Sequence, residues 1–277
     1  MWHTLLLWLI GAPFVAPLKT DVTLPFQLKD GFMWVAVSVA EGPETLNLLL
    51  DTGAEVTTLD LNTAKRLNLK RGRPVKVAGV GGKGTGYWPQ TLNATLAGAK
   101  LPSRVLVTDL CALQASCQCP IDGLLGADFF RHRVVHIDFK AKTISLLAEA
   151  PAHNGPILPI RFRRSIMQVP VTVDGRRSQW LRLDTGCASP LEWVSSNAPR
   201  STRGSKISVG LAAFRLPTAY TNVELGKHHF EHVPAGIHSA PLFPGEAGLL
   251  GLGLLSRFEH VTIDGRAGQL LLSGRPE

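Results

Sequence analysis

The triplet Asp-Thr-Gly occurs twice in this chain, and the duplication constrains the fold more than any other feature. The first copy, Asp51-Thr52-Gly53, follows the apolar run L-N-L-L-L, and the second, Asp184-Thr185-Gly186, follows W-L-R-L. Further along, each copy is followed by Gly-Leu-Leu-Gly, at 123–126 and at 248–251. Because order and approximate spacing are kept, the sequence predicts two similar lobes within one chain.

Two weaker echoes support the same repeat. V-A-V-S-V-A-E-G at 35–42 returns as V-P-V-T-V-D-G at 169–175, and V-V-H-I-D-F at 134–139 returns as H-V-T-I-D-G at 260–265. Asp, Thr and Gly are common in ordinary turns, so a single triplet would carry little weight. Two triplets in matching repeats favour a paired site.

A pair of aspartates suggests a definite chemistry. Two carboxyl groups held about 3 Å apart cannot both ionise, so they share one proton, and one then acts as base while the other acts as acid. We therefore take Asp51 and Asp184 as the catalytic candidates. The neighbouring threonines offer hydroxyls that can hydrogen-bond across the junction, and the glycines let backbone approach a ligand. These supporting positions are Thr52, Gly53, Thr185 and Gly186.

The segments D-T-G-A-E-V-T-T-L at 51–59 and G-L-L-G-A-D-F-F at 123–130 resemble the aspartic proteases of the pepsin and retropepsin clan. The resemblance implies an all-β acid-protease fold with two homologous retropepsin-like β-barrel lobes in one chain. It also implies that each Gly-Leu-Leu-Gly element supports the aspartate of its own lobe. The chain looks like a fused retropepsin-like dimer, and we expect a monomer.

By the same resemblance, the activity is that of an aspartic endopeptidase acting on a peptide or protein substrate. Water activated by the Asp51/Asp184 dyad would hydrolyse the peptide bond, with no metal and no organic cofactor. The second loop departs from the family pattern, since Gly186 is followed by Cys187-Ala188-Ser189-Pro190, and a proline interrupts strand hydrogen bonding. The alternative is thus a catalytically weak peptide-binding or inhibitory module on the same fold.

A Gly-rich stretch, V-A-G-V-G-G-K-G-T-G-Y-W at 77–88, fits the hairpin flap that closes over substrate in this family. We take Gly81 and Gly82 as its tip, and Tyr87 and Trp88 as apolar cover for the substrate; simple hairpin packing is the alternative for these two side chains. The equivalent region around 203–222 is less clearly tipped by glycine. The stretch lacks the G-K-[ST] ending of a phosphate-binding loop.

Composition and punctuation fit this organisation. A chain of 277 residues, 45% of them hydrophobic, can bury a sizeable core. Alternation such as F-M-W-V-A-V-S-V predicts strands, with a helix expected at 61–69. The stretch E-A-P-A-H-N-G-P at 149–156 has linker composition. We therefore expect an N-terminal lobe over 18–150 and a C-terminal lobe over 151–277.

Residues 1–17 contain an apolar run of signal-peptide length that is too short to span a bilayer. It predicts an exported protein, periplasmic or secreted, with no stable membrane span; an apolar tail that packs on the body is the alternative. The net charge of +8 is dispersed, and no motif indicates nucleic-acid binding.

Cysteines and histidines are candidates for other chemistry. Cys111, Cys117 and Cys119 suit a short-loop disulfide from Cys111 to one of the other two, although connectivity does not follow from sequence. Cys187 has no histidine beside it in the sequence, which favours a structural role. His228-His229-x-x-His232 lacks an accompanying acidic pattern, so a solvated turn is favoured over metal binding.

Overall fold

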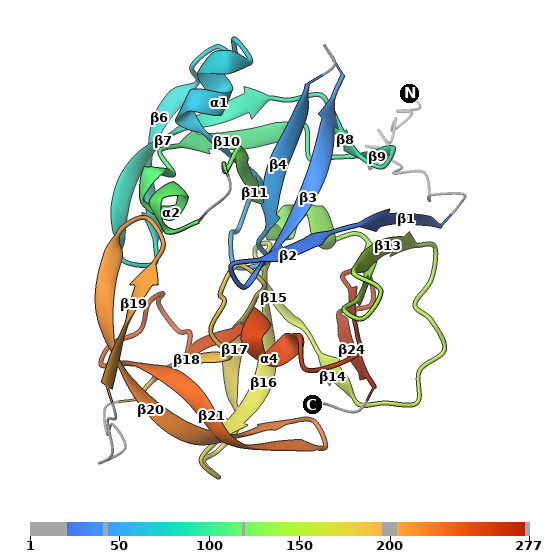
Figure 1. The fold of residues 1–277 in the computed structure, drawn as a ribbon, viewed down its shortest axis with the longest axis vertical. Coiled ribbons are helices and arrows are strands. Elements are labelled where there is room, and N and C mark those ends of the chain that lie inside the picture. Colours follow the sequence, from blue (N-terminus) through green and yellow to red (C-terminus); the bar gives the residue numbers. More distant parts are fainter. Residues whose placement is uncertain (1–20, 41–43, 118–119, 196–203, 275–277) are drawn as a thin grey trace, which may run out of the picture.

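The computed structural model describes residues 21–40, 44–117, 120–195 and 204–274 (Figure 1). The predicted export segment at 1–17 and Cys119 lie outside these residues. Within them the chain is rich in strands, with four short helices, so the predicted all-β class is confirmed; the two β-barrel lobes stay a prediction. No helix among the described residues is long and apolar enough to cross a membrane.

The first half of the chain forms a ten-stranded sheet, coloured blue to green in Figure 1. Its strand order is β6-β7-β10-β5-β11-β4-β3-β8-β9, with β2 paired to β3. The strands are β2 Gln27–Lys29, β3 Phe32–Val39, β4 Thr45–Leu50, β5 Thr58–Asp60, β6 Arg73–Gly79, β7 Gly82–Thr91, β8 Ala94–Leu96, β9 Ala99–Lys100, β10 Arg104–Thr108 and β11 Gly123–Leu125. The helices are α1 Leu61–Arg66, α2 Cys111–Ser116 and α3 Ala127–Phe130.

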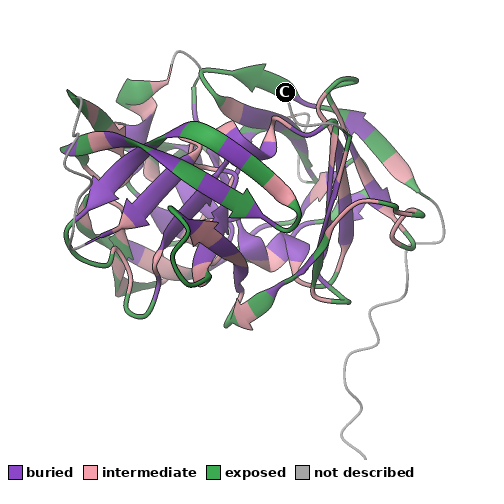
Figure 2. Ribbon diagram, turned by 90° about the horizontal axis from the view of Figure 1, so that it is seen from below, coloured by how far each residue is buried: buried purple, intermediate pink, exposed green. Residues whose placement is uncertain are grey.

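The second half forms an eight-stranded sheet, coloured yellow to orange in Figure 1, with the order β15-β16-β17-β22-β18-β21-β20-β19. Its strands are β15 Arg161–Arg163, β16 Ile166–Val173, β17 Gln179–Asp184, β18 Leu191–Val194, β19 Gly204–Val209, β20 Ala213–Leu225, β21 His228–His238 and β22 Gly248–Gly251, followed by helix α4 Leu252–Leu255. Buried and exposed residues alternate along β20, as expected for a strand with one face on the core (Figure 2).

A third sheet joins the halves. Its order is β1-β13-β12-β23-β24-β14, so three strands of the first half are followed by three of the second. These strands are β1 Val22–Pro25, β12 Val134–Asp138, β13 Thr143–Leu147, β14 Ile157–Pro159, β23 His260–Asp264 and β24 Gln269–Ser273. The echoing segments 134–139 and 260–265 meet at its centre, where β12 and β23 pair antiparallel from Val134↔Asp264 to Asp138↔His260.

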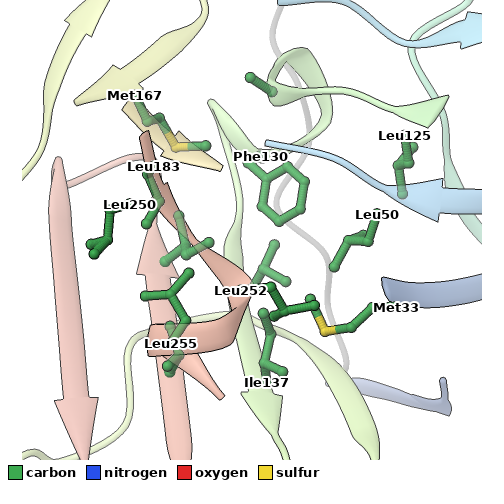
Figure 3. Packing of buried hydrophobic residues seen from close by; sticks show 14 of the residues in the cluster. Met33, Leu50, Leu125, Phe130, Ile137, Met167, Leu183, Leu250, Leu252 and Leu255 are labelled. Atoms are coloured by element: carbon green, nitrogen blue, oxygen red, sulfur yellow. The ribbon is translucent and has the colours of Figure 1, made fainter. Parts of the chain in front are cut away.

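One large core cluster draws on both halves and on the joining sheet. Figure 3 shows apolar side chains from the two halves around Phe130 and Ile137; those labelled are Met33, Leu50, Leu125, Met167, Leu183, Leu250, Leu252 and Leu255. Residues 148–156, between β13 and β14, contain no strand or helix, in agreement with the linker composition. The proposed lobe boundary at 150 stays a prediction.

The expected helix is shorter than predicted, and the expected disulfide from Cys111 is wrong. The helix expected at 61–69 is α1, which begins after Asp60, whose side chain accepts from the backbone N–H of Asn62, and ends at Arg66. Cys111 carries a free thiol, so the expected disulfide from Cys111 does not form. For Cys117 the reason is geometric: α2 separates the two cysteines, and six residues of helix rise about 9 Å, beyond the Cα separation of a disulfide.

Candidate active site

Asp51 and Asp184 each stand at the end of an apolar strand. β4 ends at Leu50, and β17 ends at Asp184 itself. Each strand runs parallel to the Gly-Leu-Leu-Gly strand of its own half, β11 or β22. The backbone N–H of Asp51 donates to the carbonyl of Leu125 at 3.0 Å, and Asp184 lies in register with Gly251. Strands with neighbours on both sides hold the start of each aspartate loop in place.

The two loops are joined by reciprocal threonine hydrogen bonds. The backbone N–H of Thr52 donates to Oγ1 of Thr185 at 3.0 Å, and that of Thr185 donates to Oγ1 of Thr52 at 3.0 Å. The hydroxyls donate onward to the carbonyls of Leu183 and Leu50, both at 2.8 Å. Thr52 and Thr185 are 0% and 1% exposed, so these bonds have no competition from water.

The carboxyl groups face each other across this junction. A β-carbon added at Gly53 would lie 2.4 Å from Cγ of Asp184, and one added at Gly186 would lie 2.5 Å from Cγ of Asp51. Each carboxyl therefore rests against the glycine of the opposite loop, where no side chain fits. The negative charge of Asp51 raises the pKa of Asp184, so the pair favours a state in which only one carboxyl is ionised.

The two aspartates are not equivalent. Oδ1 of Asp51 accepts from the backbone N–H groups of Gly53 at 2.9 Å and Ala54 at 3.0 Å. Oδ1 of Asp184 accepts from Gly186 at 2.9 Å, whereas the N–H of Cys187 points to the main-chain oxygen of Asp184 at 3.3 Å. The carboxyl of Asp51 thus receives two backbone hydrogen bonds and that of Asp184 receives one.

Protonation follows from this difference. Burial raises the pKa of Asp51, and the N–H groups of Ala54 and Gly53 oppose the rise. For Asp184, burial and then the negative charge of Asp51 raise the pKa well above its usual value. Since the two groups titrate as a pair, the favoured state over a range of pH has one proton between them.

An unpredicted arginine lies beside the pair. Arg182, two residues before Asp184, forms a buried bidentate ion pair with Glu246, with Nε–Oε2 and Nη2–Oε1 distances of 2.7 Å. Its Nη1 donates to the carbonyl oxygen of Gly53 at 2.7 Å. In the sequence W-L-R-L this arginine resembles an ordinary outward-facing strand residue. Only the pairing with Glu246, far along the chain, indicates that it is buried.

Two hairpins meet tip to tip. The predicted flap is the β6–β7 hairpin, with Gly81 at its tip in a left-handed conformation, φ 82°. The second half supplies a matching hairpin, β19–β20, in the region around 203–222 whose sequence is less clearly tipped by glycine. The N–H of Leu211 donates to the carbonyl of Val80 at 2.9 Å, and a β-carbon on Gly79 would lie 2.9 Å from Leu211. Figure 1 shows the ribbons of the two hairpins, β6–β7 and β19–β20.

The remaining flap candidates are spread along β7. Gly82 is the first residue of β7, next to the tip, and a β-carbon there would lie 3.6 Å from Ala212 of the other hairpin. Tyr87 and Trp88 lie further down the strand, beneath the guanidinium groups of Arg71 and Arg104, at 4.9 and 5.5 Å from the ring centroids. Their described contacts are those of hairpin packing.

Pro190 leaves the strand that follows it intact. β18 begins at Leu191, directly after Pro190, just as β5 begins directly after Thr57. In the first half the N–H and hydroxyl of Thr57 donate to Asp128 at 2.9 and 2.7 Å. Proline has no N–H to donate, and the second half places Gly253 against it instead, where a β-carbon would lie 2.8 Å from the proline nitrogen. The second half thus lacks both the N–H donor of Thr57 and the carboxylate acceptor of Asp128, because Pro190 and Gly253 hold the matching positions.

Residues 35–129 of the chain match the family model for aspartyl protease. The match supports a retropepsin-like aspartyl protease family for this protein. It includes Asp51, the whole motif at 51–59 and all but the last residue of the motif at 123–130, and it ends before the second repeat. A comparison with curated proteins gives no match.

Proposed function

We propose that this protein is an aspartic endopeptidase whose catalytic groups are Asp51 and Asp184. The observation that carries the proposal is the reciprocal arrangement of the two loops, in which each carboxyl faces the glycine of the other loop and the threonines join them. Two acidic groups in mutual contact cost stability, so an arrangement that keeps both of them is best explained by a function that uses both.

The asymmetry of the pair suggests the role of each carboxyl. Asp51, ionised and held by two N–H groups, accepts a proton from a water molecule between the carboxyls. Asp184, which carries the shared proton, donates it to the carbonyl oxygen of the substrate as the water oxygen attacks the carbonyl carbon. Collapse of the tetrahedral intermediate then breaks the C–N bond: the proton held by Asp51 passes to the leaving nitrogen, and a hydroxyl of the intermediate returns a proton to Asp184.

The substrate is a peptide or protein segment in extended form, held between the aspartate loops and the two hairpins. Hairpin strands bind an extended chain through backbone hydrogen bonds, with side chains alternating to either side. The tips at Val80 and Leu211 close over it and exclude water from the reacting bond. Opening of this tip contact is required for substrate entry.

The test is cleavage of a mixed peptide library from about pH 3 to about pH 8. Wild type is compared with Asp51→Asn and Asp184→Asn. Asp174→Asn is the control, because Asp174 is an exposed residue whose side chain accepts from the backbone N–H of Asn222 in β20. We expect cleavage by wild type and the control but by neither dyad variant. Cleavage that survives in both dyad variants would remove this mechanism.

A binding module is the second candidate, because the second loop leaves Asp184 with a single N–H bond. In that case folded wild type binds an extended peptide without cutting it. Measuring affinity and cleavage on the same peptide separates the two functions.

The proposal extends to an exported monomer. The apolar run within residues 1–17 supports export, and the presence of both aspartate loops in one chain makes a second copy unnecessary for the site. N-terminal sequencing of protein recovered outside the cell, together with its sedimentation mass, tests both statements.

A further inference from the structure

The buried ion pair between Arg182 and Glu246 is built in detail. Their side chains are 8% and 6% exposed, and the guanidinium meets the carboxylate through two parallel hydrogen bonds. The ring of Phe243 covers the guanidinium at 3.7 Å from the ring centroid. Burying two charges is costly, and an apolar pair of similar volume is often at least as stable. Stability alone therefore does not explain the pair.

Its orientation points to the aspartates. Residues two apart on a strand face the same side, so Arg182 and Asp184 project from the same face of β17. Glu246 occupies Nε and Nη2, and the remaining nitrogen, Nη1, reaches the carbonyl of Gly53 on the opposite loop. Gly53 is the residue that lies against the carboxyl of Asp184. The positive end of the ion pair is thus directed at the aspartates.

The first half of the molecule has no ion pair at the matching positions. The corresponding position before Asp51 is Leu49, which pairs with Leu124 as Arg182 pairs with Leu249. Leu49 belongs to a small separate apolar cluster that also contains Ile121, at the position matching Glu246. At the two matched pairs of positions, the second half therefore carries an arginine and a glutamate where the first half carries a leucine and an isoleucine.

We propose that Arg182 is a positioning residue of the aspartate pair: it ties the Asp51 loop to β17 through Gly53 and brings one positive charge to the pair from the second half alone. This inference rests on the proposed function. Arg182 touches no reacting atom in this scheme and acts through Gly53 and through its field.

The charges around the pair are few among the described residues. Arg182 lowers the pKa of both aspartates, against the rise caused by burial. The thiol of Cys187 beside Asp184 stays neutral, because burial raises its pKa well above the usual value. Further away, Glu192 and Lys206 form an ion pair of 2.8 Å. The negative charge of Glu246 opposes the positive charge of Arg182 at the aspartates. Loss of Arg182 should therefore raise the pH range over which the aspartates titrate.

The test replaces the pair by its counterpart in the first half, as Arg182→Leu with Glu246→Ile, so that no buried charge is left alone. Arg161→Leu is the control, because Arg161 also covers an aromatic ring in the same sheet, at 4.5 Å from Trp180, and no described contact links it to the aspartate loops. The readouts are the titration of ¹³C-labelled aspartate carboxyls by NMR and the pH profile of kcat/KM. We expect the double variant to shift both upward by about one pH unit, and the control to shift neither.

Glu246→Gln serves as a second variant that keeps the shape of the pair. It removes the negative charge that weakens the field of Arg182, so the titration should move to lower pH, opposite to the double variant. Unchanged titrations in both variants, or an equal shift in Arg161→Leu, would overturn the inference. The NMR titration requires no turnover: shifted carboxyls in a protein that never cleaves peptide would refute the proposed function and keep this inference.

Discussion

Replacing Thr52 by alanine should separate the two aspartate loops. The hydroxyl of Thr52 donates to the carbonyl of Leu183 and accepts from the N–H of Thr185, and the whole threonine is buried. Alanine removes the hydrogen bond that each partner makes with Thr52, in a place without access to water. Each such group costs about 1–3 kcal/mol, so the free energy of unfolding should fall by about 2–6 kcal/mol.

Serine at the same position provides the matched control. Thr52→Ser keeps the hydroxyl and removes one methyl group, worth about 1 kcal/mol. The assay is urea unfolding of wild type and both variants at neutral pH, together with cleavage of one library peptide. We expect the alanine variant to be the less stable by several kcal/mol and to lose most activity. If the alanine and serine variants unfold within about 1 kcal/mol of each other, the cross-loop bonds do not hold the halves in the way described.

Three further predictions follow from single positions. Gly53→Ala places a β-carbon 2.4 Å from Cγ of Asp184 and should lower kcat by about 100-fold or more, with circular dichroism unchanged. Burial alone would raise the pKa of Glu192, but its bond from His238 and the charge of Lys206 outweigh burial and lower the pKa to about 2. Glu192→Gln should therefore cost about 3 kcal/mol at neutral pH, and its deficit in urea unfolding should vanish as the pH falls from about 4.5 towards 2, where wild type loses the same contribution. Leu211→Asp at the hairpin tip should reduce kcat/KM about tenfold and leave the unfolding free energy within about 1 kcal/mol, which peptide kinetics and urea unfolding report separately.

Features carried by local patterns were predictable from the sequence. The aspartate loops follow strands because most of the residues before them are apolar. The echo between 134–139 and 260–265 reflects two strands that pair with each other. Each of these segments is short and continuous in the chain, so its pattern can be read directly from the sequence.

Features that depend on distant partners were not predictable. Arg182 in W-L-R-L gives no indication of burial, because its partner Glu246 lies in a different segment and no motif links the two. The second hairpin has Gly210 at its tip, but most of its turn is Leu211 and Ala212, which carry no turn preference, and its position is defined by contact with Val80. Pro190 suggested an altered strand, and its compatibility with β18 depends on the absence of a side chain at Gly253.

The difference between Leu49 and Arg182 has a consequence for how such a site can change over generations. In a symmetric dimer of identical chains, any substitution is made twice, so an arginine beside one aspartate would face its own copy beside the other, and the two like charges would repel. A chain that carries both repeats can change one side and leave the other as it was. The joining sheet, in which three strands of each repeat pair edge to edge, keeps the halves in register while they diverge. Fusion thus allows the two carboxyls of a two-fold site to have different charges beside them.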